Sequence, residues 1–279
     1  MLNYKHAYHA GNHADVLKHV CLIYFIKSIK YSYNSILYID THAGSGYYDL
    51  NNEHIQKNKE HQTGIEKMLS FTTNDPYLRF YLKTINNINK SNKLKFYPGS
   101  PKIIQHLTDK LDELYFYELH TNEFRLLKNK FLKNSNIKII NDDGFKFPNK
   151  IKIKKQKKGI ILIDPSYEEK DDHEKVINLI TKNYEQLENK IIIIWYPMIN
   201  RNDTNNFIDG FKKTGIQNIL RIEMPIQNDN EEINMTGSGL LVFNAHNKTK
   251  QSLRGTIIEL QKCLQLKGNK KKVIVNYLR

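Results

Sequence analysis

The stretch Gly159-Ile-Ile-Leu-Ile-Asp-Pro-Ser-Tyr167 decides the fold that we expect for this chain. Its first five residues are apolar or small, without polar alternation, which is typical of a strand buried on both faces of a parallel sheet. Ligands of open α/β sheets bind beyond the carboxyl ends of such strands, so we expect Asp164 and Tyr167 to meet a substrate. An ordinary strand-ending turn is the alternative, because Asp-Pro occurs in many loops.

The residue types after this strand indicate chemistry on a planar amine. The carboxylate of Asp164 and exposed backbone carbonyls accept hydrogen bonds from an NH₂ group. Pro165 stiffens the turn, and the ring of Tyr167 offers a face on which a base can stack.

A second strand-like run, Ile36-Leu-Tyr-Ile-Asp40, leads into the loop Thr41-His-Ala-Gly-Ser-Gly46. Glycines in this place let the backbone approach a ligand closely. The dinucleotide-binding fingerprint lacks its third glycine, because Asp49 stands there. A nicotinamide cofactor is therefore disfavoured.

Two further strand-like runs, at 114–118 and 137–143, also end in acidic residues. An acid at such a position is the usual device for holding ribose hydroxyls. None of these strand ends is specific by itself. Together, in chain order, they describe a pocket for adenosine and a reacting group, formed by Asp40, Glu118, Asp143 and Asp164.

With these motifs the sequence resembles the class I S-adenosylmethionine-dependent N6-adenine methyltransferases, whose catalytic signature is Asp-Pro-Pro-Tyr. This chain has Asp-Pro-Ser-Tyr at 164–167. Over nearly its whole length it looks more closely like the bacterial enzymes that methylate an adenine of 23S ribosomal RNA at N6. The segments with this resemblance are Met1-Leu-Asn-Tyr4-Lys-His6-Ala-Tyr-His9-Ala-Gly11-Asn-His-Ala-Asp-Val-Leu-Lys18-His19, Asp40-Thr-His42-Ala-Gly44, Tyr97-Pro-Gly-Ser100-Pro101, Glu118-Leu-His120, Asp143-Gly144 and Trp195-Tyr-Pro197.

The resemblance implies a Rossmann-like class I methyltransferase fold and S-adenosylmethionine as the methyl donor. It implies that the donor is bound by His19, His42, Ser100, Glu118, Asp143, Gly144 and Asp164. Asp164 would also be the catalytic residue, and Tyr4 would gate the site or contact the substrate. His6 and Lys18 would support activity near the same pocket. Ser166 replaces the second proline of the signature, but the Asp164 carboxylate and the Pro165 carbonyl remain, so we expect activity to survive.

The remaining pattern predicts one α/β domain over residues 1–279, with a mostly parallel, doubly wound sheet. A helix over 13–31, with Asn12 as its N-cap, precedes the first strand. Residues 47–92 interrupt the alternation with helical segments near 64–71 and 76–89, and we expect them to form an inserted helical subdomain. The later elements are strands near 114–119, 136–141, 159–163, 190–196, 218–223 and 239–244 and helices near 101–111, 121–133, 173–186, 203–213 and 250–266.

Composition agrees with an RNA-binding enzyme without deciding the matter. The formal charge is +14, from 43 basic and 29 acidic residues, which suits a polyanion such as RNA. A bias of the genome toward Lys, Asn and Ile codons would give the same charge. The densest basic run, 150–158, could follow a phosphate backbone or be a solvated loop before a core strand. The polar stretch 227–239 could be a mobile loop near the substrate or a surface hairpin.

Other features limit the compartment and the cofactors. Cys21 and Cys263 lie far apart, so a disulfide framework is improbable. No apolar stretch approaches the ~20 residues that span a bilayer, and the first residues do not follow a secretory signal pattern. Seven of the 11 histidines fall within the first 61 residues, yet no familiar ligand spacing is completed, so we expect no metal. We therefore expect a cytoplasmic protein that does not bind a membrane, with a monomer favoured.

These residues suggest direct methyl transfer to adenine N6. Hydrogen bonds from the amine to Asp164 and the Pro165 carbonyl would favour developing positive charge on nitrogen, and Asp164 would take the released proton directly or through water. Tyr167 would stack on an adenine that is flipped out of its own stack. Two alternatives remain open: DNA adenine methylation, and a non-catalytic RNA-binding assembly factor that kept the fold.

Overall fold

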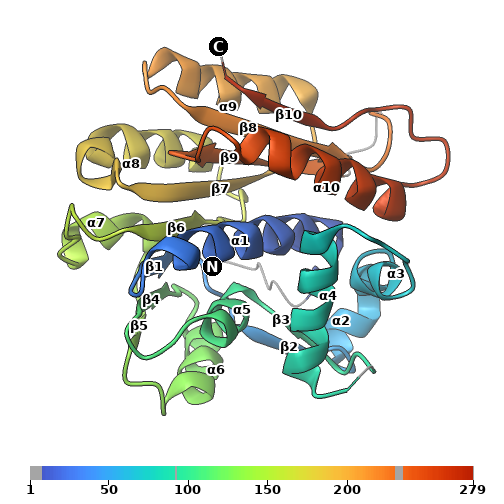
Figure 1. The fold of residues 1–279 in the computed structure, drawn as a ribbon, viewed down its shortest axis with the longest axis horizontal. Helices are drawn as coiled ribbons and strands as arrows, with labels where there is room; N and C mark the ends of the chain where they lie inside the picture. The colour runs from blue at the N-terminus through green and yellow to red at the C-terminus, as the bar shows by residue number, and fades with distance from the viewer. Residues whose placement is uncertain (1–7, 92, 230–234, 279) are drawn as a thin grey trace.

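The central element is an eight-stranded sheet in the computed structural model, which describes residues 8–91, 93–229 and 235–278 (Figure 1). Five neighbouring strands are parallel and are followed by three antiparallel ones. In spatial order they are β5 (Ile137–Ile140), β4 (Glu113–Tyr117), β1 (Leu37–Asp40), β6 (Gly159–Ile163), β7 (Lys190–Met198), β9 (Gly237–Phe243), β8 (Ile219–Pro225) and β10 (Ile274–Tyr277). This arrangement confirms the Rossmann-like, mostly parallel α/β fold.

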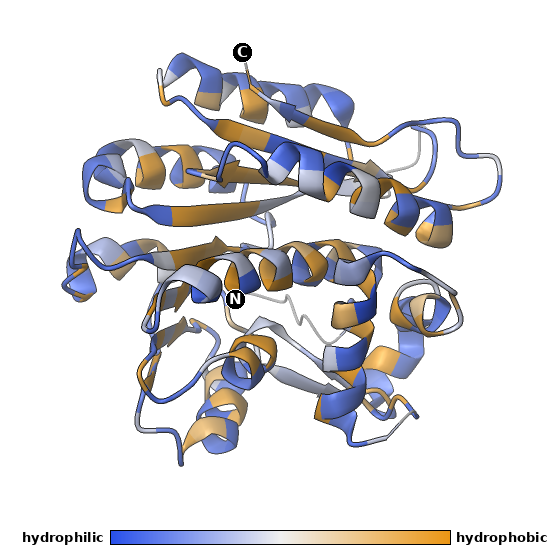
Figure 2. Ribbon diagram, in the orientation of Figure 1, coloured by the Kyte–Doolittle hydropathy of each residue, from blue (hydrophilic) through white to orange (hydrophobic). Residues whose placement is uncertain are grey.

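Helices cover both faces of the sheet. The main ones are α1 (His13–Ser32), α5 (Ser100–Leu107), α6 (Thr121–Phe131), α8 (Asp172–Leu187), α9 (Arg201–Lys213) and α10 (Thr249–Leu264), with the short η3 (Gly144–Lys146) and α7 (Phe147–Lys150) after β5. One core layer joins α1, α5, α6 and α10 to the sheet, and the other joins α8 and α9 to its opposite face. Figure 2 shows hydrophobic residues along the strands, whereas α8 and α9 alternate hydrophobic and hydrophilic positions.

Helix α1 is buried on every side along most of its length. All residues from His13 to Ile26 are buried, because the helix lies between the sheet and α4, α5 and α10. Asn12 caps it as expected, accepting hydrogen bonds from the backbone N–H groups of Ala14 and Asp15. Its polar side chains His13, Asp15, Lys18 and His19 also lie inside the protein.

The region expected to be an insertion contains α2 (Glu53–Asn58), η2 (Glu60–Gln62), α3 (Ile65–Leu69) and α4 (Pro76–Asn89). It is bounded by a small antiparallel sheet of β2 (Tyr47–Asp49) and β3 (Phe96–Pro98). Helices α3 and α4 match the two predicted helical segments. This region also contacts the main fold, because Thr256 of α10 donates a hydrogen bond to Asp75, the N-cap of α4. The subdomain boundaries 47–92 remain a prediction.

The basic run 150–158 lies before the amino end of β6, at the opposite end of that strand from Asp164. Lys155 pairs with Glu188 at 2.9 Å, and Lys157 pairs with Glu113 at 2.6 Å. These contacts favour the solvated, ion-paired loop over an RNA-tracking surface beside the site.

Candidate active site

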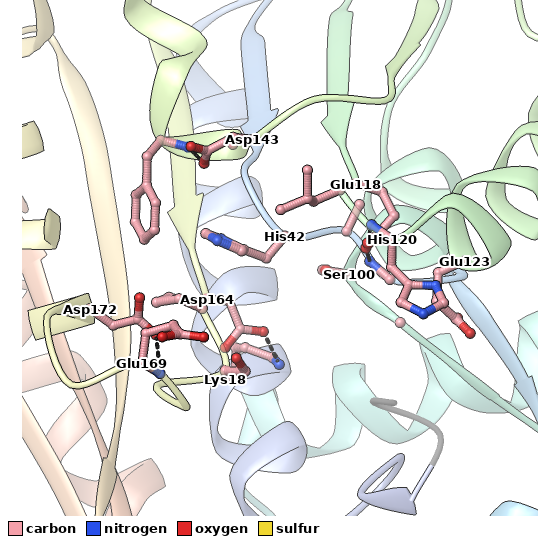
Figure 3. Close-up of a pocket in the computed structure, with 18 of the residues that line it drawn as sticks. Lys18, His42, Ser100, Glu118, His120, Glu123, Asp143, Asp164, Glu169 and Asp172 are labelled. Carbon is pink, nitrogen blue, oxygen red and sulfur yellow. Dashed lines mark hydrogen bonds and ion pairs between the residues drawn. The ribbon is translucent and has the colours of Figure 1, made fainter. Parts of the chain in front are cut away.

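A cavity of about 410 Å³ opens at the carboxyl ends of β1, β4, β5 and β6 (Figure 3). It brings together every predicted donor-binding residue: His19, His42, Ser100, Glu118, Asp143, Gly144 and Asp164. Lys18 and Pro165 also line it. The remaining lining residues are Ala43, Gly44, Tyr48, Gly99, Leu119, His120, Glu123, Phe145, Ser166, Glu169, Asp172 and Lys175.

Asp40, which is fully buried at the end of β1, fixes the part of the cavity wall that contains Ser100. Its Oδ2 accepts hydrogen bonds from the hydroxyls of Ser100, at 2.7 Å, and Tyr38, at 3.0 Å. Burial raises the pKa of Asp40 to about 6, although these two hydrogen bonds oppose the shift. Asp40 therefore holds the start of α5 against β1, and it orients Ser100 from behind the cavity wall.

Glu118, at the end of β4, organises the two loops on its side of the cavity. Its carboxylate accepts hydrogen bonds from the backbone N–H groups of Gly44, at 2.8 Å, and His120, at 2.7 Å. Burial raises the pKa of Glu118 to about 7, with both backbone hydrogen bonds acting in the opposite direction. The acid predicted for ribose hydroxyls therefore also shapes the glycine-bearing loop that faces it.

Gly144 allows the chain after β5 to lie directly against the loop after β1. A Cβ atom at this position would lie 1.8 Å from the backbone oxygen of Thr41, far inside any van der Waals contact. Asp143 caps the same turn by accepting a hydrogen bond from the N–H of Phe145 at 2.9 Å. Gly144 is thus required by a close approach of two backbones beside the cavity, and Asp143 caps the turn that follows.

The imidazole of His42 lies beside the ring of Phe145, with ring centroids 5.0 Å apart. Its Nδ1 is 2.7 Å from the hydroxyl oxygen of Thr41. Burial lowers the pKa of His42 to about 3, so this ring is neutral near pH 7. It can offer a hydrogen bond or a flat surface to a bound molecule, but no positive charge.

Lys18 reaches Asp164 from the second turn of α1, and the two residues are 146 positions apart in the sequence. Its Nζ lies 2.5 Å from Oδ2 of Asp164 (Figure 3). The same Nζ lies 2.8 Å from Oδ1 of Asp15. Burial disfavours the charged lysine, but the two carboxylates outweigh it and raise the pKa of Lys18. Next to it, Nδ1 of His19 lies 2.7 Å from the hydroxyl of Tyr97 in β3. The charged side chain of Lys18 is therefore fixed beside Asp164, at the end of the cavity next to β6.

The loop after β6 has an unusual backbone at Tyr167, whose φ is 55°. A bulky residue rarely adopts this left-handed conformation, which costs of order 1–3 kcal/mol. The Tyr167 hydroxyl donates a 2.6 Å hydrogen bond to the backbone oxygen of Trp195 in β7, and its ring packs near His173 and Phe207.

Tyr167 does not line the cavity in this arrangement. It anchors the loop that presents Asp164, Pro165 and Ser166. The predicted stacking of adenine on Tyr167 would require the ring to leave this aromatic cluster.

Several residues at the site were not singled out from the sequence. Asp15 looks like an ordinary first-turn helix acid, and only its contact with Lys18 gives it a place in the site. His120 and Glu123 line the cavity at the start of α6, where the segment Glu118-Leu-His120 was the available signal. Tyr4 and His6 lie outside the described residues, so their proposed roles have no structural account.

Among the residues that the structure describes, no group of three or more His, Cys, Asp or Glu side chains could hold a metal ion. Cys21 and Cys263 are both buried free thiols.

No helix within 8–91, 93–229 or 235–278 is long and apolar enough to cross a membrane.

Acidic residues after successive parallel strands, a cavity at their carboxyl ends and the observed strand order define a class I methyltransferase fold. Residues 33–275 match the family described as "Ribosomal RNA large subunit methyltransferase D, RlmJ", and the chain belongs to this family.

Two curated relatives are both named "Ribosomal RNA large subunit methyltransferase J". The protein from Escherichia coli is 36% identical over 260 residues, covering 92% of each chain. The protein from Haemophilus influenzae is 36% identical over 245 residues, covering 88% of this chain and 87% of the relative. A crystal structure of a Legionella pneumophila protein superposes with a TM-score of 0.83 at 28% identity, covering 97% of this chain and 98% of the other.

Proposed function

We propose that this chain methylates N6 of an adenine in 23S ribosomal RNA, with S-adenosylmethionine as the methyl donor. The main observation behind the proposal is the Asp164 carboxylate, held by Lys18 at the end of β6 and facing a cavity between four strand ends. The family of the chain and the names of its relatives support a large-subunit ribosomal RNA as substrate. The structure by itself supports an adenosine-type donor and an amine acceptor.

The chemistry of the cavity walls fits this donor. The loops at Gly44 and Gly144 lie closely against other parts of the chain. An added Cβ would overlap the Tyr48 hydroxyl at Gly44 and the Thr41 backbone at Gly144. Carboxylates at the ends of β4 and β5 suit the hydroxyls and the amine of an adenosine. An acidic lining also suits a cation, which favours the sulfonium form of the donor over its neutral product.

In the transfer step, the N6–methyl bond forms while the methyl–sulfur bond breaks, and its electron pair goes to sulfur. S-adenosylmethionine supplies both the methyl group and this leaving group. Asp164 and the Pro165 carbonyl hold the amine by accepting hydrogen bonds from its two N–H groups, which aims the nitrogen lone pair at the methyl group. Asp164 also stabilises the positive charge that develops on nitrogen and receives the released proton directly or through water.

The other residues act around this centre. The hydroxyl of Tyr167 fixes the loop by its bond to Trp195, and Lys18 fixes the carboxylate of Asp164. We retain Tyr4 as a substrate contact and His6 as a supporting residue, on the resemblance alone. We propose that the enzyme acts in the cytoplasm, where ribosomal RNA is made and modified. We propose that it acts as a monomer.

The test is transfer of labelled methyl from S-adenosylmethionine to protein-free 23S ribosomal RNA from cells that lack the gene, with mass spectrometry of the product nucleoside. Wild type should give N6-methyladenosine, and Asp164→Asn should lower the rate at least about a hundredfold while the fold is kept. Duplex DNA and a ribosomal assembly intermediate serve as the other substrates. Transfer to DNA alone, or wild-type rates with Asp164→Asn, would refute the proposal.

A further inference from the structure

A buried chain of three charged side chains extends from the reactive end of the cavity into α1. Asp15 is 2% exposed, Lys18 is 5% exposed and Asp164 is 11% exposed, counted over their side chains. The Lys18 Nζ lies between the two carboxylates, 2.8 Å from Asp15 and 2.5 Å from Asp164. Two carboxylates, one buried and one at the cavity wall, therefore share one ammonium group.

Asp15 is itself held rigidly. Its Oδ2 accepts a 2.9 Å hydrogen bond from the backbone N–H of Gly11, while its Oδ1 faces Lys18. Gly11 has a φ of 80° and precedes Asn12, whose side-chain amide donates to Glu60 at 2.9 Å. The Asp15 carboxylate is thus fixed by the turn that starts α1, and a negative charge in this first turn also suits the helix dipole.

The sharing of Lys18 matters for the proposed chemistry. An ammonium paired with Asp164 alone would neutralise that carboxylate at the moment when it must stabilise positive charge on the amine. A second carboxylate on the same ammonium offsets part of its field, because charge interactions are strong where water is excluded. With Lys18 shared in this way, less of the Asp164 charge is cancelled on the side of the cavity.

We propose that Asp15 is a positioning residue for methyl transfer: it holds the Lys18 ammonium from behind, so that Lys18 orients Asp164 without cancelling its charge. This inference rests on the proposed function, because it needs Asp164 to meet the reacting amine. Asp15 touches neither donor nor substrate in this scheme and acts only through Lys18.

Asp15→Asn tests the inference because asparagine keeps the shape and can still accept the Gly11 hydrogen bond. We expect kcat for 23S ribosomal RNA to fall about tenfold or more, with KM for the RNA within about twofold of wild type. Asp75→Asn is the matched control, because Asp75 caps α4 and does not line the cavity. It should leave kcat unchanged.

A binding measurement gives a readout that does not depend on turnover. S-adenosylmethionine carries a sulfonium charge, which would lie in the cavity that Asp164 lines, whereas the sulfur of S-adenosylhomocysteine is neutral. Removing the charge of Asp15 should weaken calorimetric affinity for the first by about three- to tenfold relative to the second. A purely structural role for Asp15 would weaken both ligands equally or neither.

Lys18→Met completes the experiment as a double-mutant cycle. If Asp15 acts through Lys18, Asp15→Asn should cause no further loss of kcat in the Lys18→Met background. Equal losses in both backgrounds, unchanged kcat in Asp15→Asn, or an unchanged affinity ratio of the two ligands would each overturn the inference. Failure of wild type to methylate the RNA would instead refute the proposed function, so the two failures are distinguishable.

Discussion

Replacing Gly144 by alanine should damage both the stability of the protein and its donor site. The added Cβ would lie 1.8 Å from the backbone oxygen of Thr41, whereas ordinary contacts begin near 3.4 Å. The two loops must therefore separate by more than an ångström. The atoms that the new Cβ would meet all belong to the Thr41 backbone, so no flexible side chain can move aside. Overpacking of this kind costs about 3 kcal/mol, which corresponds to a fall in Tm of roughly 5 °C for a chain of this size.

The matched control is Gly255→Ala, which makes the same chemical change inside α10. No heavy atom lies within 4 Å of the Cβ that it would add, and alanine is the better helix former. This variant should gain about 0.5–1 kcal/mol and a Tm higher by roughly 2 °C. Calorimetric unfolding measures the Tm of both variants. Titration with S-adenosylmethionine measures their affinity for the donor, which should be at least about tenfold weaker only for Gly144→Ala. Equal Tm values and equal affinities for the two variants would refute the assignment of Gly144 as a close backbone contact.

Two further predictions follow from hydrogen bonds and burial around the site. The pKa of Glu118 is about 7 in the folded protein, above its ordinary 4.5, so folding favours its protonated form. Its contribution to the free energy of unfolding should therefore be fully present below about pH 4.5 and decline by up to about 3 kcal/mol as the pH rises through 7. Urea unfolding of wild type and Glu118→Gln between pH 5 and 8 measures this, and a pH-independent difference would contradict it. Tyr167→Phe should lose about 0.5–1.5 kcal/mol and slow methyl transfer, because the hydroxyl bond to Trp195 fixes the loop. Tyr184→Phe, which loses the bond to Asn244, should lose similar stability and keep its kcat.

The sequence by itself determined the fold class and most of its elements. The expected strand at 159–163 has those bounds in the structure, and the first helix begins where Asn12 predicted a cap. These features are local, because an apolar run without alternation must be buried on both faces and a capping side chain acts within three residues. The acids at strand ends were also predictable, since parallel strands place their carboxyl ends at one edge.

The antiparallel end of the sheet and the small sheet of β2 and β3 were not predicted. The edge strand β10 pairs with β8, and β9 lies between β7 and β8 out of chain order. Such pairings depend on which strand lies alongside, and nothing in the local pattern of a short strand records its partner.

Only the tertiary structure decided how the site residues meet. Lys18 and Asp164 are 146 positions apart, and Asp15 enters the site only because α1 is buried against the sheet. The orientation of Tyr167 also depends on its bond to a neighbouring strand. Side-chain charge and shape are written in the sequence, but distances between groups from separate elements arise only when those elements pack, and the chemistry depends on those distances.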